Sequence, residues 1–239
     1  MREITFQADP QEAYRQYSEQ GYFCEPAVFS ARECAALIDA GLSLPSARDG
    51  NLLPVMNVHK IGGVFLDAMR KPALLGVMDR LVQGRANGLH SQFYFTPPNR
   101  QGLGCHQDNY FAEAKPDAFA SAWIALMDIS VENGGLYVYP GSHREGQLPV
   151  RPVGDQRADK RQAVYEEAVV PAHYPRVDPA IRQGTVVFLH GYVAHGSHSN
   201  RSASNRYALL NTYIRAREHY RAGQTATREE FELERHAPL

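Results

Sequence analysis

The chain has 239 residues, enough for one domain with a sizeable hydrophobic core. Its composition, 44% hydrophobic and 21% charged, is ordinary for a globular protein. The formal net charge of −1, without a long basic run, argues against nucleic acid as the main partner. Cys24, Cys34 and Cys105 are an odd number without paired spacing, so no disulfide framework is expected. With no signal peptide and no apolar run long enough to span a membrane, we expect a cytoplasmic protein without a membrane partner.

The first part of the chain, residues 1–87, is predicted to be largely helical. Asp9-Pro10 marks a helix start, and Ser30 with Glu33 fits a capping box, so residues 9–45 are expected as helix broken at Gly21. A further helix with helical apolar spacing is expected between Pro72 and Gly84.

Short strands separated by turns are expected from about residue 88. The predicted strands are 91–95, 105–111, 119–129, 136–139, 185–190, 194–199 and 206–214. Asn133-Gly134-Gly135 gives a hairpin turn signal. The long polar connection 144–180 is expected as a functional insertion or lid, and the charged residues 215–239 as a peripheral helix or a loose tail.

Helices followed by short, glycine-punctuated strands predict the fold class. We expect a single domain, 1–239, that is mainly β with flanking helices. Its core, residues 88–214, is expected to be a double-stranded β-helix, the cupin-like jelly roll. The mouth of such a barrel is a natural site for a small molecule.

A His-x-Asp pair, His106 and Asp108, lies in a segment predicted to be extended. In a strand, side chains at i and i+2 share a face, so this imidazole and carboxylate can converge. They supply two thirds of a two-His-one-carboxylate Fe(II) site. Three histidines compete for the third position. His190 closes an apolar strand, as core and turn histidines do, His195 has small neighbours that let a metal approach, and His198 fits a pocket edge or the surface.

Arg206 opens the last apolar strand. A buried guanidinium requires an anion, and its planar fork suits a carboxylate held by two hydrogen bonds. That anion is either a ligand or an internal Asp or Glu, and this pattern alone allows both.

The order of these motifs resembles the phytanoyl-CoA dioxygenase family, which comprises non-haem Fe(II), 2-oxoglutarate-dependent oxygenases with a jelly-roll core. The resemblance runs from about residue 55 to 214. It rests on His106-x-Asp108, Asn133-Gly134-Gly135-Leu136, Pro140-Gly141-Ser142-His143, His195-Gly196-Ser197 and Arg206. It implies that His106, Asp108 and His195 bind Fe(2+). It also implies that 2-oxoglutarate and O2 are consumed and that succinate and CO2 are released, with ascorbate as a candidate reductant.

The resemblance also implies a cosubstrate site. Arg206 would pair with the distal carboxylate of 2-oxoglutarate, with the Ser197 hydroxyl beside it. Trp123, Lys60 and Gln92 match family positions at the same cosubstrate. Their alternative roles are a core aromatic, a solvated surface lysine and a polar strand residue.

Candidate substrate contacts are expected near the metal strand and the later histidines. They are Asn109, Tyr110, His143, His198 and Asn211, for which turn, core or rim roles are the alternatives. Halogenating relatives replace the carboxylate ligand with a small residue, so Asp108 favours hydroxylation of a small-molecule metabolite. The competing functions are a cupin-like metal-dependent isomerase or hydrolase and a non-catalytic jelly-roll binding module. No sequence feature indicates an oligomeric state.

Overall fold

The computed structural model describes residues 4–50, 52–153, 166–223 and 227–235. Its helices are α1 (Pro10–Gln20), α2 (Ala31–Leu42), α3 (Pro45–Arg48), α4 (Gly63–Met69), α5 (Pro72–Leu81) and α6 (Asn109–Ala112), with 3-10 turns η1 (Val58–Ile61) and η2 (Ser142–Glu145). Its strands are β1 (Tyr22–Glu25), β2 (Val55–Met56), β3 (Ala86–Thr96), β4 (Phe119–Ala125), β5 (Leu136–Val138), β6 (Val150–Pro152), β7 (Glu166–Ala168), β8 (Val186–His190), β9 (His195–Ser197) and β10 (Arg206–Arg215).

The N-terminal helices begin and end where local capping predicts. The Asp9 side chain accepts a hydrogen bond from the Glu12 amide (3.1 Å) at the start of α1, and Ser30 and Glu33 form a complete capping box on α2. Gly21, with φ 76°, ends α1 in the left-handed conformation that glycine adopts without steric strain. The helix starts predicted at these positions are confirmed.

The prediction of helix across the rest of residues 9–45 is wrong for Tyr22–Glu25. These residues form β1, which pairs antiparallel with β8. The pairing partner lies more than 160 residues away along the chain, so the local sequence gives no signal for it.

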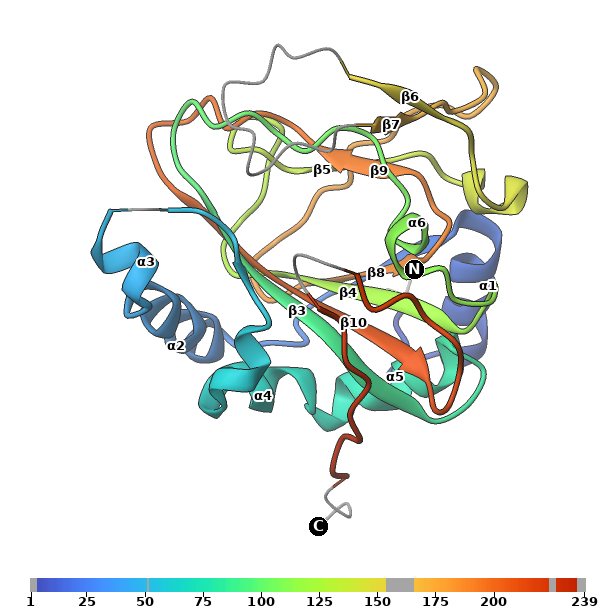
Figure 1. Ribbon diagram of the computed structural model, residues 1–239, viewed down its shortest axis with the longest axis horizontal. Helices are drawn as coiled ribbons and strands as arrows, with labels where there is room; N and C mark the ends of the chain where they lie inside the picture. Colours follow the sequence, from blue (N-terminus) through green and yellow to red (C-terminus); the bar gives the residue numbers. More distant parts are fainter. Residues whose placement is uncertain (1–3, 51, 154–165, 224–226, 236–239) are drawn as a thin grey trace.

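Six strands form one antiparallel sheet in the order β1-β8-β4-β10-β3-β2 (Figure 1). Strand β10 lies between β4 and β3, with Leu210 opposite both Trp123 and Gln92. Because successive side chains point to opposite faces of a strand, each of these three strands contributes residues to both faces of the sheet.

One face of this sheet packs against the helices, and the other faces the interior of the barrel. Phe93, Ile124 and Leu209 belong to the large core cluster that includes residues of α2, α4 and α5. Trp123 and Leu210 belong to a separate cluster on the opposite face. Figure 1 shows α2, α4 and α5 on one side of the sheet and the shorter strands β5–β7 and β9 on the other.

These shorter strands form the second layer. Strands β5 and β9 pair with Leu136 opposite Ser197 and Val138 opposite His195, and β6 pairs with β7. Two antiparallel layers with helices outside them form the predicted jelly roll with flanking helices, so the fold class is confirmed.

Two loop predictions are corrected or limited by the structure. The Asn133-Gly134-Gly135 turn does not close a hairpin, because β4 and β5 lie in different sheets. Instead the Asn133 side chain bonds the Ser130 amide (2.9 Å) and the Asp128 carbonyl (2.8 Å), and the chain crosses between layers. Of the predicted 144–180 lid, residues 154–165 lie outside the described residues, and the remainder includes the β6–β7 pair.

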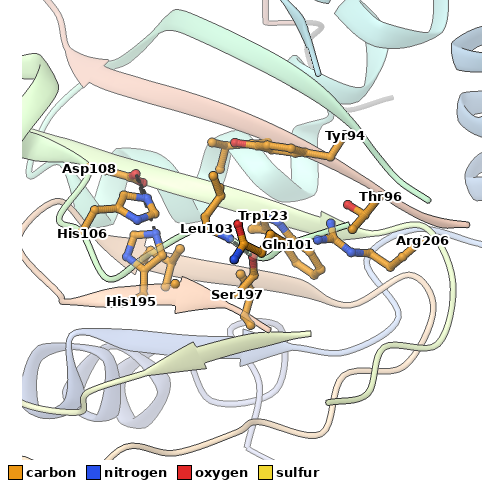
Figure 2. Close-up of a pocket in the computed structure, with 14 residues that line it drawn as sticks. Tyr94, Thr96, Gln101, Leu103, His106, Asp108, Trp123, His195, Ser197 and Arg206 are labelled. Carbon is orange, nitrogen blue, oxygen red and sulfur yellow. Dashed lines mark hydrogen bonds and ion pairs between the residues drawn. The ribbon is translucent and has the colours of Figure 1, made fainter. Parts of the chain in front are cut away.

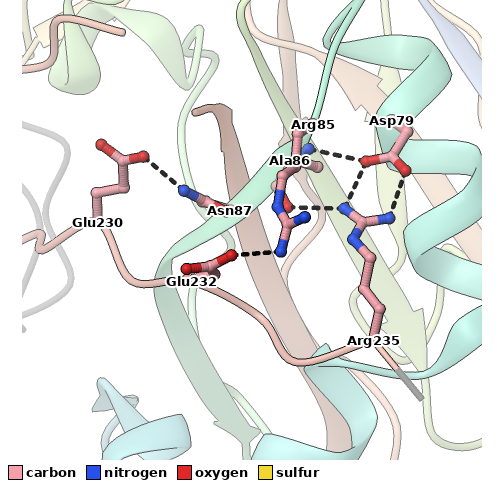
Figure 3. Close-up of polar contacts among 7 residues, drawn as sticks. All are labelled: Asp79, Arg85, Ala86, Asn87, Glu230, Glu232 and Arg235. Atoms are coloured by element: carbon pink, nitrogen blue, oxygen red, sulfur yellow. Dashed lines mark hydrogen bonds and ion pairs between the residues drawn. The ribbon is translucent and has the colours of Figure 1, made fainter. Parts of the chain in front are cut away.

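The C-terminal residues are not the helix or loose tail that their charge suggested. The described residues 216–223 and 227–235 contain no helix, and Phe231 pairs with Gly88 of β3 as an isolated bridge. Figure 3 shows how charged side chains fasten this segment: Arg235 binds Asp79, Glu230 binds Asn87 and Glu232 binds Arg85. The charged side chains of this segment bind residues that are far away in the sequence, and composition alone does not reveal such partners.

Among the described residues, every helix is too short or too polar to cross a bilayer.

Candidate metal centre and cosubstrate pocket

His106, Asp108 and His195 converge at one end of a pocket between the two layers (Figure 2). Asp108 Oδ1 lies 3.5 Å from His106 Nε2 and 3.7 Å from His195 Nε2. One ligand atom from each residue falls within 4.8 Å of the others. Of the three histidines that the sequence left open, the structure therefore brings His195 to the His-x-Asp pair.

Backbone pairing between distant segments creates this convergence. The His106 amide donates to the His195 carbonyl (2.8 Å), and the His195 amide donates to the His106 carbonyl (3.0 Å). The expected strand over 105–111 is wrong beyond this bridge, because Asp108 has helical dihedral angles (φ −60°, ψ −36°) and directly precedes α6. The pair converges through a turn rather than through strand alternation.

The remaining polar atoms of the three side chains are already hydrogen-bonded. Nδ1 of His106 donates to the Gly104 carbonyl (2.8 Å), and Nδ1 of His195 donates to the Val193 carbonyl (3.0 Å). These bonds leave both Nε2 atoms unprotonated in the neutral rings and free to bind a metal. The Ser121 hydroxyl donates to Asp108 Oδ2 (2.5 Å), which leaves Oδ1 directed at the two imidazoles. The donor set fits a two-His-one-carboxylate metal site.

The electrostatics of this cluster favour an anionic carboxylate beside a neutral imidazole. Burial alone would raise the pKa of Asp108, but His195, His106 and the Ser121 hydrogen bond lower it overall. Burial, together with the charge of His106, lowers the pKa of His195 to about 4. An ionised carboxylate and a neutral ring are the forms that bind a divalent cation.

Arg206 lies at the opposite end of the pocket, where no carboxylate of a described residue pairs with it. Its side chain is buried, and no hydrogen bond or ion pair among the described residues uses its guanidinium, whose Nε is fully enclosed. The guanidinium carbon lies 5.7 Å from the Trp123 ring centroid. Burial lowers the pKa of Arg206 to about 10. The alternative of an internal salt bridge is therefore not what the structure shows, and the site is arranged for an anion.

Trp123 and Ser197 also line the pocket between the two ends (Figure 2). Trp123 projects from β4 and is 4% exposed. Ser197 follows His195 by two residues on β9, and its Oγ accepts from the Leu103 amide (2.9 Å). That hydroxyl can still donate its own proton into the pocket.

Lys60 and Gln92 do not line the pocket. Lys60 lies on η1, remains half exposed and forms an ion pair with Glu229 (2.7 Å). The Gln92 amide nitrogen contacts His90 Nε2 (2.9 Å), and its carbonyl accepts from the Tyr94 hydroxyl. The structure gives Lys60 its surface role and gives Gln92 a place in a strand network beside the pocket.

The five candidate substrate contacts are dispersed, and none lines the pocket. Asn109 is buried and closes α6 by bonding Ala114 (2.9 and 3.0 Å). Tyr110 donates to Glu166 of β7. Asn109 and Tyr110 therefore stabilise a turn and a loop, and do not contact the pocket.

The other three candidates lie elsewhere. His143 packs against Gly21 and contacts the Ser18 carbonyl (3.1 Å), which fixes η2 to α1. His198 pairs with Asp178 (2.6 Å). Asn211 projects from β10 on the same face as Leu209, toward the helices, so its assignment to the pocket is wrong.

Several lining residues were not assigned to the site from the sequence, and two pairs of them show why. The first pair is Tyr94 and Thr96, and the second is Gln101 and Leu103. Tyr94 and Thr96 continue the alternation that begins with Gln92 on β3, so this periodicity could have identified them. Gln101 and Leu103 lie in an irregular segment, for which periodicity gives no signal.

Comparisons with known proteins agree with this geometry. The phytanoyl-CoA dioxygenase (PhyH) family model matches residues 17–208. Phytanoyl-CoA dioxygenase of Arabidopsis thaliana is 27% identical over 154 residues, which is 63% of this chain and 52% of that protein. The chain thus spans about half the length of the curated relatives it matches.

Two solved structures share the fold over nearly the whole chain. The non-heme alpha ketoglutarate dependent carbocyclase SnoK from nogalamycin biosynthesis has a TM-score of 0.75 at 26% identity, covering 94% of this chain and 92% of that one. The epimerase SnoN, in complex with Fe3+, alpha ketoglutarate and nogalamycin RO, has a TM-score of 0.71 at 21% identity, covering 97% and 96%.

Proposed function

Because this chain belongs to the phytanoyl-CoA dioxygenase family, we propose that it is an Fe(II)- and 2-oxoglutarate-dependent oxygenase that hydroxylates a small-molecule metabolite. One observation carries the proposal. A two-His-one-carboxylate cluster and an unpaired buried arginine lie at opposite ends of a single pocket. A metal ion alone does not require the arginine, whereas a dicarboxylate that also reaches the metal requires both.

The proposed ligands are His106, Asp108 and His195. When bound, iron and 2-oxoglutarate would supply the oxidising chemistry, in which O2 is consumed and succinate and CO2 are released. Arg206 would hold the distal carboxylate and so orient the keto acid along the pocket. Ser197 would donate a hydrogen bond to the same carboxylate.

The apolar lining has a second role. Trp123, Leu189 and Leu210 form the barrel side of the pocket and exclude water from the space between metal and arginine. A drier site strengthens the hydrogen bonds that fix the cosubstrate. Asp108 occupies the carboxylate position, so the proposed outcome is hydroxylation and not halogenation.

The two alternative functions explain less of the geometry. A cupin-like isomerase or hydrolase would use the metal cluster but leaves Arg206 unexplained. A non-catalytic binding module would use the pocket but does not need three metal-ligand atoms within 4.8 Å. The family membership favours neither.

The proposal includes a reducing, cytoplasmic setting. Cys24, Cys34 and Cys105 are all free thiols. Free cysteines are typical of reducing compartments. Ascorbate as a reductant in the assay follows from the same proposal, because it would keep the iron in the Fe(II) state.

The test is release of succinate from 2-oxoglutarate in the presence of Fe(II) and O2. We expect the wild-type protein to release succinate and Asp108→Ala to lose both bound iron and turnover. Asp67→Ala is the matched control, because Asp67 is an exposed carboxylate on α4 that pairs with Arg70. Turnover in Asp108→Ala equal to that of the control would contradict the ligand assignment.

A further inference from the structure

The C-terminal segment, residues 227–235, is fastened to the start of β3 along its length (Figure 3). Phe231 and Gly88 exchange two backbone hydrogen bonds (2.9 and 3.0 Å). The Glu230 carboxylate accepts from the Asn87 amide (2.7 Å), and Arg235 donates to Asp79 Oδ1 (2.6 Å). These backbone and side-chain hydrogen bonds fix the position of the segment beside the barrel.

Arg228 lies in this segment between further fixed points. The Asn57 side chain donates to the Thr227 carbonyl (3.2 Å), the Arg228 amide donates to the Ala222 carbonyl (2.7 Å), and Glu229 pairs with Lys60 (2.7 Å). The backbone is therefore held on both sides of Arg228, and the position of its side chain is constrained.

The Arg228 guanidinium has no anionic partner within the described part of the chain. Its side chain is half-buried, and none of the hydrogen bonds or ion pairs there involves it. Its neighbour Arg221 provides the contrast: Arg221 donates to the Tyr110 carbonyl (2.8 Å) and pairs with Glu113 (2.7 Å). A partly buried arginine without such partners gains most from a bound anion.

Direct contacts place the backbone around Arg228 beside His90 of β3. The Asn57 side chain that donates to the Thr227 carbonyl (3.2 Å) also contacts His90 Nδ1 (2.6 Å), and the Glu229 amide donates to the Leu89 carbonyl (3.3 Å). Burial lowers the pKa of Arg228, while the Asp108 carboxylate opposes this effect. Its charge in turn helps to lower the pKa of His90, after burial. Arg228 thus lies within electrostatic range of a proposed iron ligand and of the pocket-facing side of β3.

The sheet register places His90 itself near the metal centre. His90 lies opposite Thr212, and Thr212 lies opposite Ser121, whose hydroxyl supports Asp108. His90 therefore occupies the row of the sheet that lies beneath the metal centre. Arg206, by contrast, lies opposite Thr96 at the far end of β3.

His90 is uncharged and is held by hydrogen bonds on both of its ring nitrogens. Asn57 Oδ1 contacts His90 Nδ1 (2.6 Å), and His90 Nε2 contacts the Gln92 amide nitrogen (2.9 Å). Since an amide nitrogen only donates, Nε2 accepts, and Nδ1 carries the proton of a neutral ring. With His90 neutral, Arg228 supplies a positive charge on this side of the metal centre, and no described residue pairs with it.

We propose that Arg228, with the His90–Gln92 face of β3, forms a substrate subsite that binds an oxyanion, a carboxylate or a phosphate, of the molecule to be oxidised. This inference rests on the proposed function for the identity of the reaction. It assigns the two arginines different ligands: Arg206 binds the cosubstrate, and Arg228 binds the substrate.

The test uses binding in metal-free protein, so that it does not depend on turnover. Trp123 is the only tryptophan and lines the pocket, so its fluorescence reports occupancy. With 2-oxoglutarate present to occupy Arg206, the protein is titrated with 3-phenylpropionate, with phenyl phosphate and with the neutral 3-phenylpropionamide. Wild type, Arg228→Met, Arg228→Lys and the matched control Arg221→Met are compared.

We expect the wild type to bind at least one of the two anions about tenfold or more tightly than the amide. Arg228→Met should lose that preference, Arg228→Lys should retain part of it, and Arg221→Met should keep it. Preference for the carboxylate or for the phosphate identifies the class of oxyanion. The subsite would be overturned if the wild type binds the acids no more tightly than the amide, or binds none of the three compounds. It would also be overturned if Arg228→Met keeps the wild-type preference.

The same titrations separate this inference from the proposed function. Affinity for 2-oxoglutarate, measured first in each variant, should not change in Arg228→Met. A weaker 2-oxoglutarate affinity in that variant would mean that Arg228 serves the cosubstrate, which contradicts the subsite. Failure of the proposed function appears separately, as absence of succinate release by the wild type with Fe(II), 2-oxoglutarate and O2, and it leaves the comparison of the anions with the amide interpretable.

Discussion

The two faces of the six-stranded sheet show how one set of strands serves stability and chemistry separately. On β10, Leu209 points into the helix-covered core, while Arg206 and Leu210 point into the barrel. On the helix side Leu209 belongs to a large cluster of buried apolar residues. On the barrel side Arg206 is also buried, but no carboxylate among the described residues pairs with it. The first face lowers the free energy of the fold, whereas the second carries an unsatisfied charge that awaits a ligand.

Arg206→Met should give the largest effect, and on binding rather than on stability. We expect the dissociation constant of 2-oxoglutarate to rise about 100-fold, because a charge-assisted contact is lost. The free energy of unfolding of the metal-free protein should stay constant or rise by about 1 kcal/mol, because an unpaired buried charge is removed. Trp123 fluorescence and urea unfolding measure the two quantities. Arg201→Met, an exposed arginine, is the control, and a large loss of stability in Arg206→Met would break the comparison.

Leu209→Ala should show the opposite pattern. Leu209 is 0% exposed, and truncation should reduce the free energy of unfolding by about 3 kcal/mol through lost contacts and a cavity. Affinity for 2-oxoglutarate should change less than about twofold in the folded protein, since the residue faces away from the pocket. The exposed Leu42→Ala serves as control in urea unfolding, where the shift should be near zero. An equal effect of both variants would contradict the separation of the faces.

Ser121→Ala tests the support beneath the metal centre. Loss of the hydroxyl that donates to Asp108 Oδ2 should lower Fe(II) affinity by about tenfold, because the carboxylate is then less firmly oriented. A competition titration with a metal indicator measures this change. Ser204→Ala removes an exposed hydroxyl and should leave the affinity unchanged. An unaltered affinity in Ser121→Ala would show that Asp108 does not depend on β4.

His90 provides the smallest test, a pH dependence of stability in metal-free protein. Burial, then the charges of Arg228 and His59, lower the pKa of His90 to about 3, below the value near 6.5 of an unfolded histidine. Between these values the unfolded chain binds a proton that the folded chain does not, so stability falls as pH falls below about 6.5.

His90→Gln should therefore reduce this slope by about 1 kcal/mol per pH unit. Urea unfolding between pH 6.5 and 4.5 gives the slope, and the exposed His173→Gln should leave it nearly unchanged. If His90→Gln has the wild-type slope, His90 is not held neutral in the folded protein.

Local signals predicted the parts of this fold that depend on local physics. The Ser30 capping box began α2, and the apolar run after Arg206 formed β10 along its predicted length. His106, Asp108 and Arg206 were found by residue type and spacing, and the family resemblance selected His195 from three candidates. The structure brings all four to one pocket.

Several of the misses share a physical cause, which is pairing over long sequence separation. Residues 22–25 became β1 because β8 lies beside them, and the charged C-terminal segment is ordered because Asp79, Arg85 and Asn87 supply its partners. Lys60 turned outward because Glu229 binds it. None of these partners is visible within a window of local sequence.

The most direct test of the central claim is the absorption spectrum of the protein with Fe(II) and 2-oxoglutarate under anaerobic conditions. A charge-transfer band that depends on 2-oxoglutarate requires a metal at the His106–Asp108–His195 centre and a keto acid bound to it. We predict the band in the wild type, a higher 2-oxoglutarate requirement in Arg206→Met, and no band in Asp108→Ala. Absence of the band in wild-type protein at saturating Fe(II) and 2-oxoglutarate would contradict the account.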